Sequence, residues 1–177
     1  MKIYIVRHGQ TDWNLKKIIQ GKKDIELNET GIAQANQIRE KVNNLDIDLI
    51  ICSTLKRARK TAEIINKDKK VKIIYKEEIM ERGMGDYEGM NSGVEGNDIY
   101  NCKKNITDMN IEPVDKLCQR IDKLFDEIKE KYSKNKILLV THSGTARAIE
   151  GYFYGVDEED YLPPEDLQNC EIREYEL

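Results

Sequence analysis

The stretch IYIVRHG (residues 3–9) decides the fold, because an apolar run of strand length ends in it at a charged dipeptide. Its apolar part is typical of a strand that is covered on both faces. Arg7 and His8 follow directly at the carboxyl end of this strand. The stretch KILLVTHSG (136–144) repeats the arrangement and places His142 at the equivalent point. The two stretches therefore predict two buried strands of one sheet.

Apolar runs of strand length alternate with amphipathic segments along the rest of the chain. The expected elements are strands at 3–6, 48–53, 72–75, 136–141 and 170–177, and helices at 32–45, 55–65, 113–133 and 145–155. Asn28 is expected to cap the first helix, and Pro113 suits the first turn of the third. The sequence therefore predicts an α/β fold, a three-layer sandwich with a mostly parallel central sheet flanked by helices on both faces.

Length and composition indicate one domain over residues 1–177. Apolar residues make up 39% of the chain and charged residues 35%, which is typical of a well-solvated globule. The polar stretch 90–112 is rich in asparagine and glycine. We expect it to form a short cap-like excursion from the core rather than a domain boundary.

Charge and cysteine usage restrict the partners and the cellular setting. The net charge of −4 disfavours nucleic acid or an anionic membrane as the main partner. No apolar run reaches the ~20 residues that span a bilayer, and the first strand begins too near Met1 to leave room for a signal peptide. The four cysteines show no close pairing, which favours a reducing compartment. We expect a cytoplasmic protein, and the abundance of lysine, isoleucine and asparagine suggests a bacterial source.

The two histidines occupy matching positions, each just past an apolar strand and just before a turn. Ligand sites of open α/β sheets lie beyond the carboxyl ends of the strands, so His8 and His142 are expected to face one crevice. Arg7 adjoins His8, and Arg57 lies early in the helix that follows the strand 48–53. Arginine forks and helix N-termini both bind anions, and a phosphate is the natural guest. The alternatives are two unrelated histidines and, for Arg57, a surface arginine in the basic run KRARK.

Five motifs in order along the chain carry a family resemblance. The chain resembles the histidine phosphatase superfamily, the phosphoglycerate-mutase-like proteins, over most of its length. The motifs are RHGQTDWN (7–14), QGKKDIELNETGIAQA (20–35), STLKRARKTA (53–62), EIMERGMGDYEG (78–89) and VTHSGTARA (140–148). The stretch LQNCEI near the C-terminus is similar to the family's last strand.

The resemblance implies that His8 is a nucleophile that forms a phosphohistidine. Attack on phosphorus requires a neutral imidazole, and the charge of Arg7 nearby favours that form. The second ring nitrogen is expected to donate to a backbone carbonyl, which fixes the tautomer. Glu81 matches the family's acid, which protonates the leaving alkoxide. The competing carboxylates in the same region are Glu77, Glu78 and Glu88.

The other matched residues are implied to bind the phosphoryl group or to lie near it. Those expected to grip its non-bridging oxygens during in-line transfer are Arg7, Asn14, Arg57 and the catalytic His142. Gln20 and Gly21 match a loop that passes close to the phosphate in the family. Nothing in this scheme requires a metal ion or another cofactor, and the expected partner is a small phosphorylated metabolite.

Two departures from the family pattern favour a phosphatase over a mutase. Ile18 stands where many relatives carry an arginine, which weakens the case for a highly anionic substrate. The segment 90–112 is shorter than the insertion of typical mutases, and a short polar cap is poorly suited to excluding water. We therefore expect hydrolysis of small phosphate monoesters. The alternatives left open are a cofactor-dependent phosphoglycerate mutase, an α-ribazole phosphatase of cobalamin synthesis, a phospho-ligand binding module and a metal hydrolase.

Overall fold

The computed structural model describes residues 1–92, 110–155, 162–163 and 167–177, and a five-stranded sheet runs through its centre. The strands are β1 (Lys2–Arg7), β2 (Leu49–Ser53), β3 (Lys72–Lys76), β4 (Ile137–Thr141) and β5 (Ile172–Glu176). Their order in the sheet is β3-β2-β4-β1-β5. The first four run parallel to their neighbours, and only β5 pairs antiparallel, against β1. The prediction of a mostly parallel sheet is confirmed.

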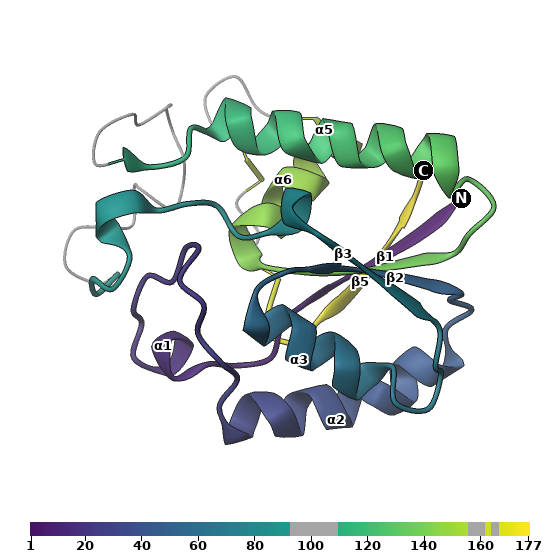
Figure 1. Ribbon diagram of the computed structural model, residues 1–177, viewed down its shortest axis with the longest axis horizontal. Coiled ribbons are helices and arrows are strands. Elements are labelled where there is room, and N and C mark those ends of the chain that lie inside the picture. The colour runs from purple at the N-terminus through teal and green to yellow at the C-terminus, as the bar shows by residue number, and fades with distance from the viewer. Residues whose placement is uncertain (93–109, 156–161, 164–166) are drawn as a thin grey trace.

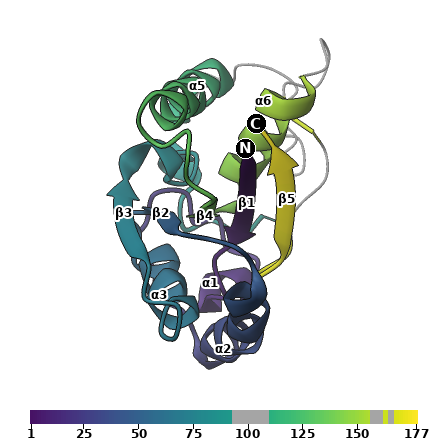
Figure 2. The same cartoon turned by 90° about the vertical axis from the view of Figure 1, so that its right-hand side faces the viewer.

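Helices cover both faces of this sheet (Figures 1 and 2). One face carries α2 (Glu29–Asn44) and α3 (Lys56–Ile65), and the other carries α5 (Val114–Lys131) and α6 (Ser143–Tyr154). The short helix α1 (Asp12–Leu15) follows β1. Figure 2 looks along the sheet and shows the three layers edge-on. The structure is thus the α/β three-layer sandwich that the sequence predicts.

The core is divided between the two faces of the sheet, as the alternation of side chains along β1 shows. Ile3 and Ile5 pack in the cluster that includes α5 and α6, whereas Tyr4 and Val6 pack in the cluster that includes α2 and α3. Successive side chains of a strand point to opposite faces, so both sets are buried only when both faces are covered. This double burial explains why consecutive residues of β1, β2 and β4 are apolar, at 3–6, 49–52 and 137–140.

The helix starts confirm one prediction and correct two. The side chain of Asn28 accepts a 2.9 Å hydrogen bond from the backbone N–H of Gly31 and caps α2 as expected. Pro113 is the N-cap of α5 rather than part of its first turn, because its ψ of 143° is extended and helical geometry begins only at the next residue. Helix α6 begins at Ser143, two residues earlier than expected.

The cap-like excursion predicted at 90–112 lies mostly outside the described residues, and only its ends, 90–92 and 110–112, belong to them. Its first end is joined to the loop after α1 by an isolated antiparallel bridge between Ile18 and Asn91. Among the helices in the described ranges, none combines the length and apolar character that a bilayer crossing requires. The single domain over the whole chain stays a prediction.

Candidate active site

The two histidines meet at the carboxyl edge of the sheet. Strands β1 and β4 are parallel neighbours, and Arg7 pairs in register with Thr141. His8 and His142 are the next residues of the two stretches, and their ring centroids lie 5.1 Å apart with both residues buried. The two histidines are therefore neighbours, as their matching contexts predicted, and this geometry does not fit two unrelated histidines; a shared functional site stays a prediction.

The hydrogen bonds of His8 determine which ring nitrogen is free to react. Its Nδ1 lies 2.7 Å from the carbonyl oxygen of Gly9, and a carbonyl only accepts, so Nδ1 carries the proton. The lone pair of the neutral ring is then on Nε2. The backbone of His8 is held as well: its N–H donates to Thr141 O at 3.0 Å, and its carbonyl accepts from Asn169 Nδ2 at 2.8 Å. These hydrogen bonds therefore fix the tautomer of the ring and its orientation.

His142 is held by two side chains from neighbouring elements. Its Nδ1 accepts a 3.2 Å hydrogen bond from Nε of Arg57, so its proton is on Nε2, which lies 2.7 Å from Oγ of Ser53. Sequence reasoning missed Ser53. It is the last residue of β2, at the edge that singled out the histidines, and that position was the available signal. Because both ring nitrogens are engaged, a phosphoryl oxygen would have to replace Ser53 as the acceptor of the Nε2 proton.

Arg57 joins three parts of the site. Besides His142, its guanidinium donates to the carbonyl of Gly21 at 2.8 Å and to that of Lys23 at 2.7 Å. The side chain is fully buried, so the reading of a surface arginine in a basic run is wrong. Burial lowers the pKa of Arg57 to about 10, which still leaves it charged at neutral pH. Gly21 has a φ of +49°, a conformation that favours glycine, and a Cβ there would also displace the side chain of Glu88.

Arg7 and Gln20 each bury a polar atom that lacks a hydrogen-bond partner among the described residues. One terminal nitrogen of Arg7 donates to Leu167 O at 2.7 Å, whereas its Nε has no partner. Oε1 of Gln20 is likewise buried without one. An unmade hydrogen bond of a buried polar group costs roughly 1–3 kcal/mol, so a bound group that supplies the missing partner is favoured. For the Nε–H of Arg7, that group would be a hydrogen-bond acceptor, and an anionic oxygen would also match the charge of the guanidinium.

Asn14 takes part in the cap of α1. Its Oδ1 accepts from the backbone N–H of Thr11 at 3.1 Å and from the Thr11 hydroxyl at 3.0 Å, and the same hydroxyl accepts from the N–H of Asn14. This capping box fixes the turn that follows Arg7 and His8. The phosphoryl contact predicted for Asn14 therefore falls to its side-chain amide nitrogen.

The carboxylate of Glu81 lies at the N-terminus of α6. It accepts from the backbone N–H of Gly144 at 3.2 Å and of Thr145 at 3.1 Å, and also from the N–H of Arg82 at 2.9 Å. A Cβ at position 144 would lie 2.8 Å from Oε1 of Glu81, so glycine permits this approach. Because α6 begins directly after His142, the same turn carries the histidine and holds the carboxylate.

The electrostatics of the site keep both imidazoles neutral. Burial lowers the pKa of His8 well below the ordinary value of 6.5, and the charges of Arg57 and then Arg7 lower it further. Burial and the charge of Arg57 act on the pKa of His142 in the same direction. The expectation that Arg7 favours neutral His8 is right in direction, but burial and Arg57 contribute more.

These lowered pKa values predict a pH-dependent stability. As the pH falls through about 6.5, the unfolded chain binds protons on both rings while the folded chain does not. The stabilisation is therefore complete above that pH and is lost as the pH falls towards the folded values. Urea titrations should give a free energy of unfolding lower by ~2 kcal/mol at about pH 5.5 than at about pH 7 on account of these rings. Replacing both histidines with asparagine should remove this contribution to the pH dependence. If the free energy of unfolding of the double variant changed with pH as in the parent, the pH dependence would not come from these rings.

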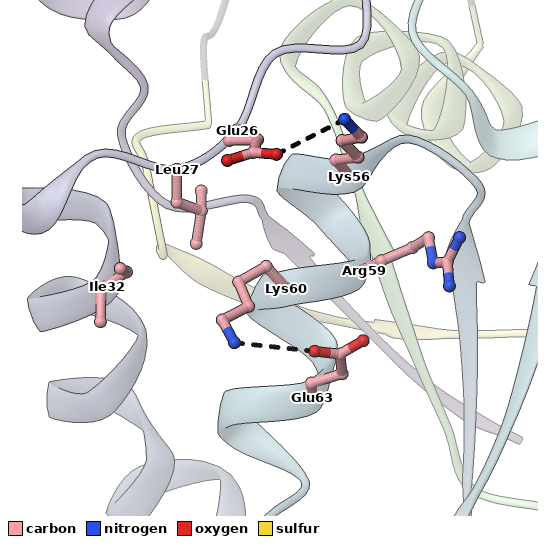
Figure 3. A pocket seen from close by; sticks show the side chains of 7 residues that line it. All are labelled: Glu26, Leu27, Ile32, Lys56, Arg59, Lys60 and Glu63. Atoms are coloured by element: carbon pink, nitrogen blue, oxygen red, sulfur yellow. Dashed lines mark hydrogen bonds and ion pairs between the residues drawn. The ribbon is translucent and has the colours of Figure 1, made fainter.

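A separate surface depression of about 460 Å³ lies between α2 and α3 (Figure 3). Its lining contains none of the predicted site residues; it comprises Glu26, Leu27, Ile32, Lys56, Arg59, Lys60 and Glu63. Lys56 pairs with Glu26 at 3.4 Å and Lys60 with Glu63 at 3.9 Å, so much of its charge is compensated within it. In the ranges that the structure describes, no three histidine, cysteine, aspartate or glutamate side chains gather as metal ligands. The candidate site is the histidine pair and its arginines.

Comparisons with known proteins agree with this geometry. The family model described as histidine phosphatase superfamily (branch 1) matches residues 3–177. An uncharacterized phosphatase, PhoE, of Bacillus subtilis is 36% identical over 160 residues, which cover 89% of this chain and 79% of the relative. A 2,3-bisphosphoglycerate-dependent phosphoglycerate mutase of Cytophaga hutchinsonii is 30% identical over 186 residues, covering 99% and 87%. The crystal structure of phosphoserine phosphatase from Entamoeba histolytica in complex with 3-phosphoglyceric acid superposes with a TM-score of 0.79 at 26% identity, covering 98% of this chain and 89% of the other.

Proposed function

The chain belongs to the histidine phosphatase superfamily, branch 1, and from that premise we propose that it hydrolyses small phosphate monoesters through a phosphohistidine on His8. The observation that carries the proposal is the approach of the two buried, neutral imidazoles beside Arg57. A neutral imidazole with an available Nε2 is a nucleophile, and the neighbouring guanidinium favours an anionic ester.

In the first step, the Nε2 lone pair of His8 forms a bond to phosphorus and the P–O bond of the ester breaks. The departing alkoxide takes the proton of the Glu81 carboxylic acid. In the second step, water attacks the phosphohistidine, gives its proton to the Glu81 carboxylate, and the P–N bond breaks. Inorganic phosphate leaves, and the neutral ring and the acid are restored.

The N–H donors of two arginines, an asparagine and a histidine are assigned to the non-bridging oxygens of the transferred phosphoryl. Arg7 contributes its Nε, the buried donor without a partner among the described residues. Arg57 keeps further N–H groups beyond the three that bind protein atoms. Asn14 contributes its amide nitrogen and His142 its Nε2 proton. Arg57 is held beside His142 before an ester binds, and the His142 Nε2 proton has only to move from Ser53 to a phosphoryl oxygen, so the charge of the transition state is stabilised with little reorganisation.

If Glu81 is the acid, the loss of rate caused by replacing Glu81 should depend on the leaving group of the ester. In Glu81→Gln, kcat/KM for an alkyl phosphate should fall by roughly 10²–10³, because an alkoxide must be protonated as it leaves. For 4-nitrophenyl phosphate the loss of kcat/KM should be smaller than roughly tenfold, since that leaving group needs little protonation and kcat/KM does not include the later attack by water. The measurement is the initial rate of phosphate release from both esters at concentrations below KM. Glu77 is an exposed carboxylate in the same region, so Glu77→Gln is the matched control and should leave both rates unchanged. Equal losses on the two esters would argue against an acid.

The mutase activity of one relative makes phosphoglycerate mutation the second candidate. The two reactions are separated by incubating the protein with 3-phosphoglycerate and catalytic bisphosphoglycerate, and by following inorganic phosphate and the 2-isomer together. Phosphate release with little isomerisation is the expected result, and efficient isomerisation with little free phosphate would replace the proposal. A small phosphorylated metabolite as substrate and a bacterial, cytoplasmic setting belong to the same proposal.

A further inference from the structure

The residue proposed as the acid lies in a segment without regular secondary structure. Glu81 falls between the two short 3-10 helices η1 (Glu77–Ile79) and η2 (Gly85–Tyr87), and the chain between them is neither helix nor strand. Proton transfer requires the carboxyl group to be held within about 0.5 Å of its working position. The segment therefore depends on contacts from outside itself.

Arg120 provides several of these contacts from α5. Its Nε donates to the carboxylate of Glu112 at 2.8 Å, and one terminal nitrogen donates to the backbone carbonyl of Glu81 itself at 3.3 Å. The other terminal nitrogen donates to the carbonyl of Glu78. One planar side chain thus binds the backbone three residues before the acid and at the acid, a combination that a lysine cannot reproduce.

Glu112 holds the other side of the segment. Its Oε2 accepts from the N–H of Gly83 at 2.8 Å, while its own backbone N–H donates to the carbonyl of Gly83 at 2.8 Å. Its carbonyl accepts from Nε of Arg82 at 2.8 Å. Burial by itself would raise the pKa of Glu112, but Arg120, the Gly83 N–H and the charge of Lys22 together outweigh burial and hold that pKa below its ordinary value. The carboxylate is therefore ionised at neutral pH and stays paired.

The ion pair and α6 hold Glu81 from two directions. The first N–H groups of α6 fix the carboxylate, and the Thr145 hydroxyl donates to Met80 O at 2.6 Å, next to it in the chain. The Glu112–Arg120 pair fixes the backbone. The side chains of the pair are only 13% and 16% exposed. A pair this buried contributes little net stability, because desolvation offsets much of the attraction. Its importance therefore lies in the backbone groups that it holds in place rather than in the free energy of unfolding.

We propose that Arg120 and Glu112 are positioning residues for the acid, acting through the backbone of residues 78–83 without touching the substrate. This inference rests on the proposed role of Glu81. Arg120→Lys keeps the charge but replaces a fork that binds both oxygens of Glu112 and the carbonyls of Glu78 and Glu81 with a single ammonium group. We expect kcat/KM for an alkyl phosphate to fall roughly tenfold and kcat/KM for 4-nitrophenyl phosphate to change little, because the second value covers only steps that need little protonation.

The matched control is Glu127→Gln, which breaks a second ion pair of α5 that is similarly buried. Glu127 lies 2.7 Å from Lys76, and the two side chains are 23% and 21% exposed. This variant removes the ion pairs of Glu127 with Lys76 and with Lys131 but no hydrogen bond to residues 78–83, so it should leave the ratio of the two rates unchanged. Thermal unfolding of every variant separates loss of fold from loss of position, and Glu112→Gln is the second variant should Arg120→Lys not fold.

A double-mutant comparison completes the test. In the Glu81→Gln background, Arg120→Lys should leave the alkyl-to-aryl rate ratio where Glu81→Gln puts it, because there is no longer an acid to position. An equal loss on both esters, or a further drop of the ratio in that background, would overturn the inference. If Glu81→Gln lowers the alkyl-to-aryl rate ratio and neither Arg120→Lys nor Glu112→Gln does, only the positioning role is wrong. If Glu81→Gln does not lower this ratio, the acid role is wrong and the positioning role with it.

Discussion

The His8→Ala variant is expected to lose turnover almost completely, with kcat lowered by a factor on the order of 10⁴ or more. Alanine removes the only nitrogen that the scheme places on phosphorus. The remaining donors can bind the ester but cannot form a covalent intermediate with it. Steady-state release of phosphate from 4-nitrophenyl phosphate measures the loss, because this ester makes the smallest demand on the acid and isolates the nucleophile.

Binding provides the control for this variant. Because Arg7 and Arg57 are retained, His8→Ala should still bind inorganic phosphate, as measured by titration calorimetry, and should unfold cooperatively. If the variant kept activity within about tenfold of the parent, His8 would not be the nucleophile. If the parent itself bound phosphate esters without turning them over, the chain would be a phospho-ligand binding module, the non-enzymatic alternative.

Arg57→Lys is expected to lower kcat/KM by roughly 10²–10³. Lysine preserves the positive charge but not the fork, and the fork is what reaches the ring of His142 together with the carbonyls of Gly21 and Lys23. The substitution therefore releases the histidine and the loop at once. The loss should appear with alkyl and aryl esters alike, since phosphoryl binding does not depend on the leaving group.

Arg59→Lys is the matched control for this substitution. Arg59 lies two residues further along α3, is exposed, and its guanidinium carbon sits 5.1 Å from the centre of the Tyr75 ring, away from the histidines. It should leave kcat/KM within about twofold of the parent. Retention of parental kcat/KM by Arg57→Lys in a folded protein would show that the fork has no part in the reaction.

The layers of the fold could be predicted from the sequence because runs of apolar residues mark the positions that are buried on both faces of the sheet. Strands that are covered on both faces must be apolar at their covered positions, and β1, β2 and β4 are apolar at 3–6, 49–52 and 137–140. Element boundaries were less certain. The sequence gives no clear signal that Ser143 and Gly144 already belong to α6, because both residue types are common in turns. Pro113 has a ring that suits either the N-cap or the first helical position, and only the backbone angles decide.

The candidate site residues that follow strand ends could be predicted from the residues themselves. Those in segments without regular secondary structure could not. His8 and His142 follow from the parallel alignment of β1 and β4, and Arg57 from the start of the next helix. No periodicity distinguishes Glu81 from the other glutamates of its segment; the resemblance did, and the structure shows α6 beneath its carboxylate. The partners of Arg120 are 8 to 42 residues away in the chain, a distance over which sequence spacing carries no signal.

Trapping the covalent intermediate tests the proposed mechanism most directly. The Glu81→Gln variant, mixed with 4-nitrophenyl phosphate labelled at phosphorus and quenched in alkali within the first turnover, should hold the label on protein. An aryl ester still phosphorylates the nucleophile, whereas removal of the base slows attack by water. The label should be stable to alkali and labile to acid, as an N–P bond is, and should map to the peptide that contains His8. Nitrophenol release without labelled protein, or label on another residue, would contradict the phosphohistidine mechanism.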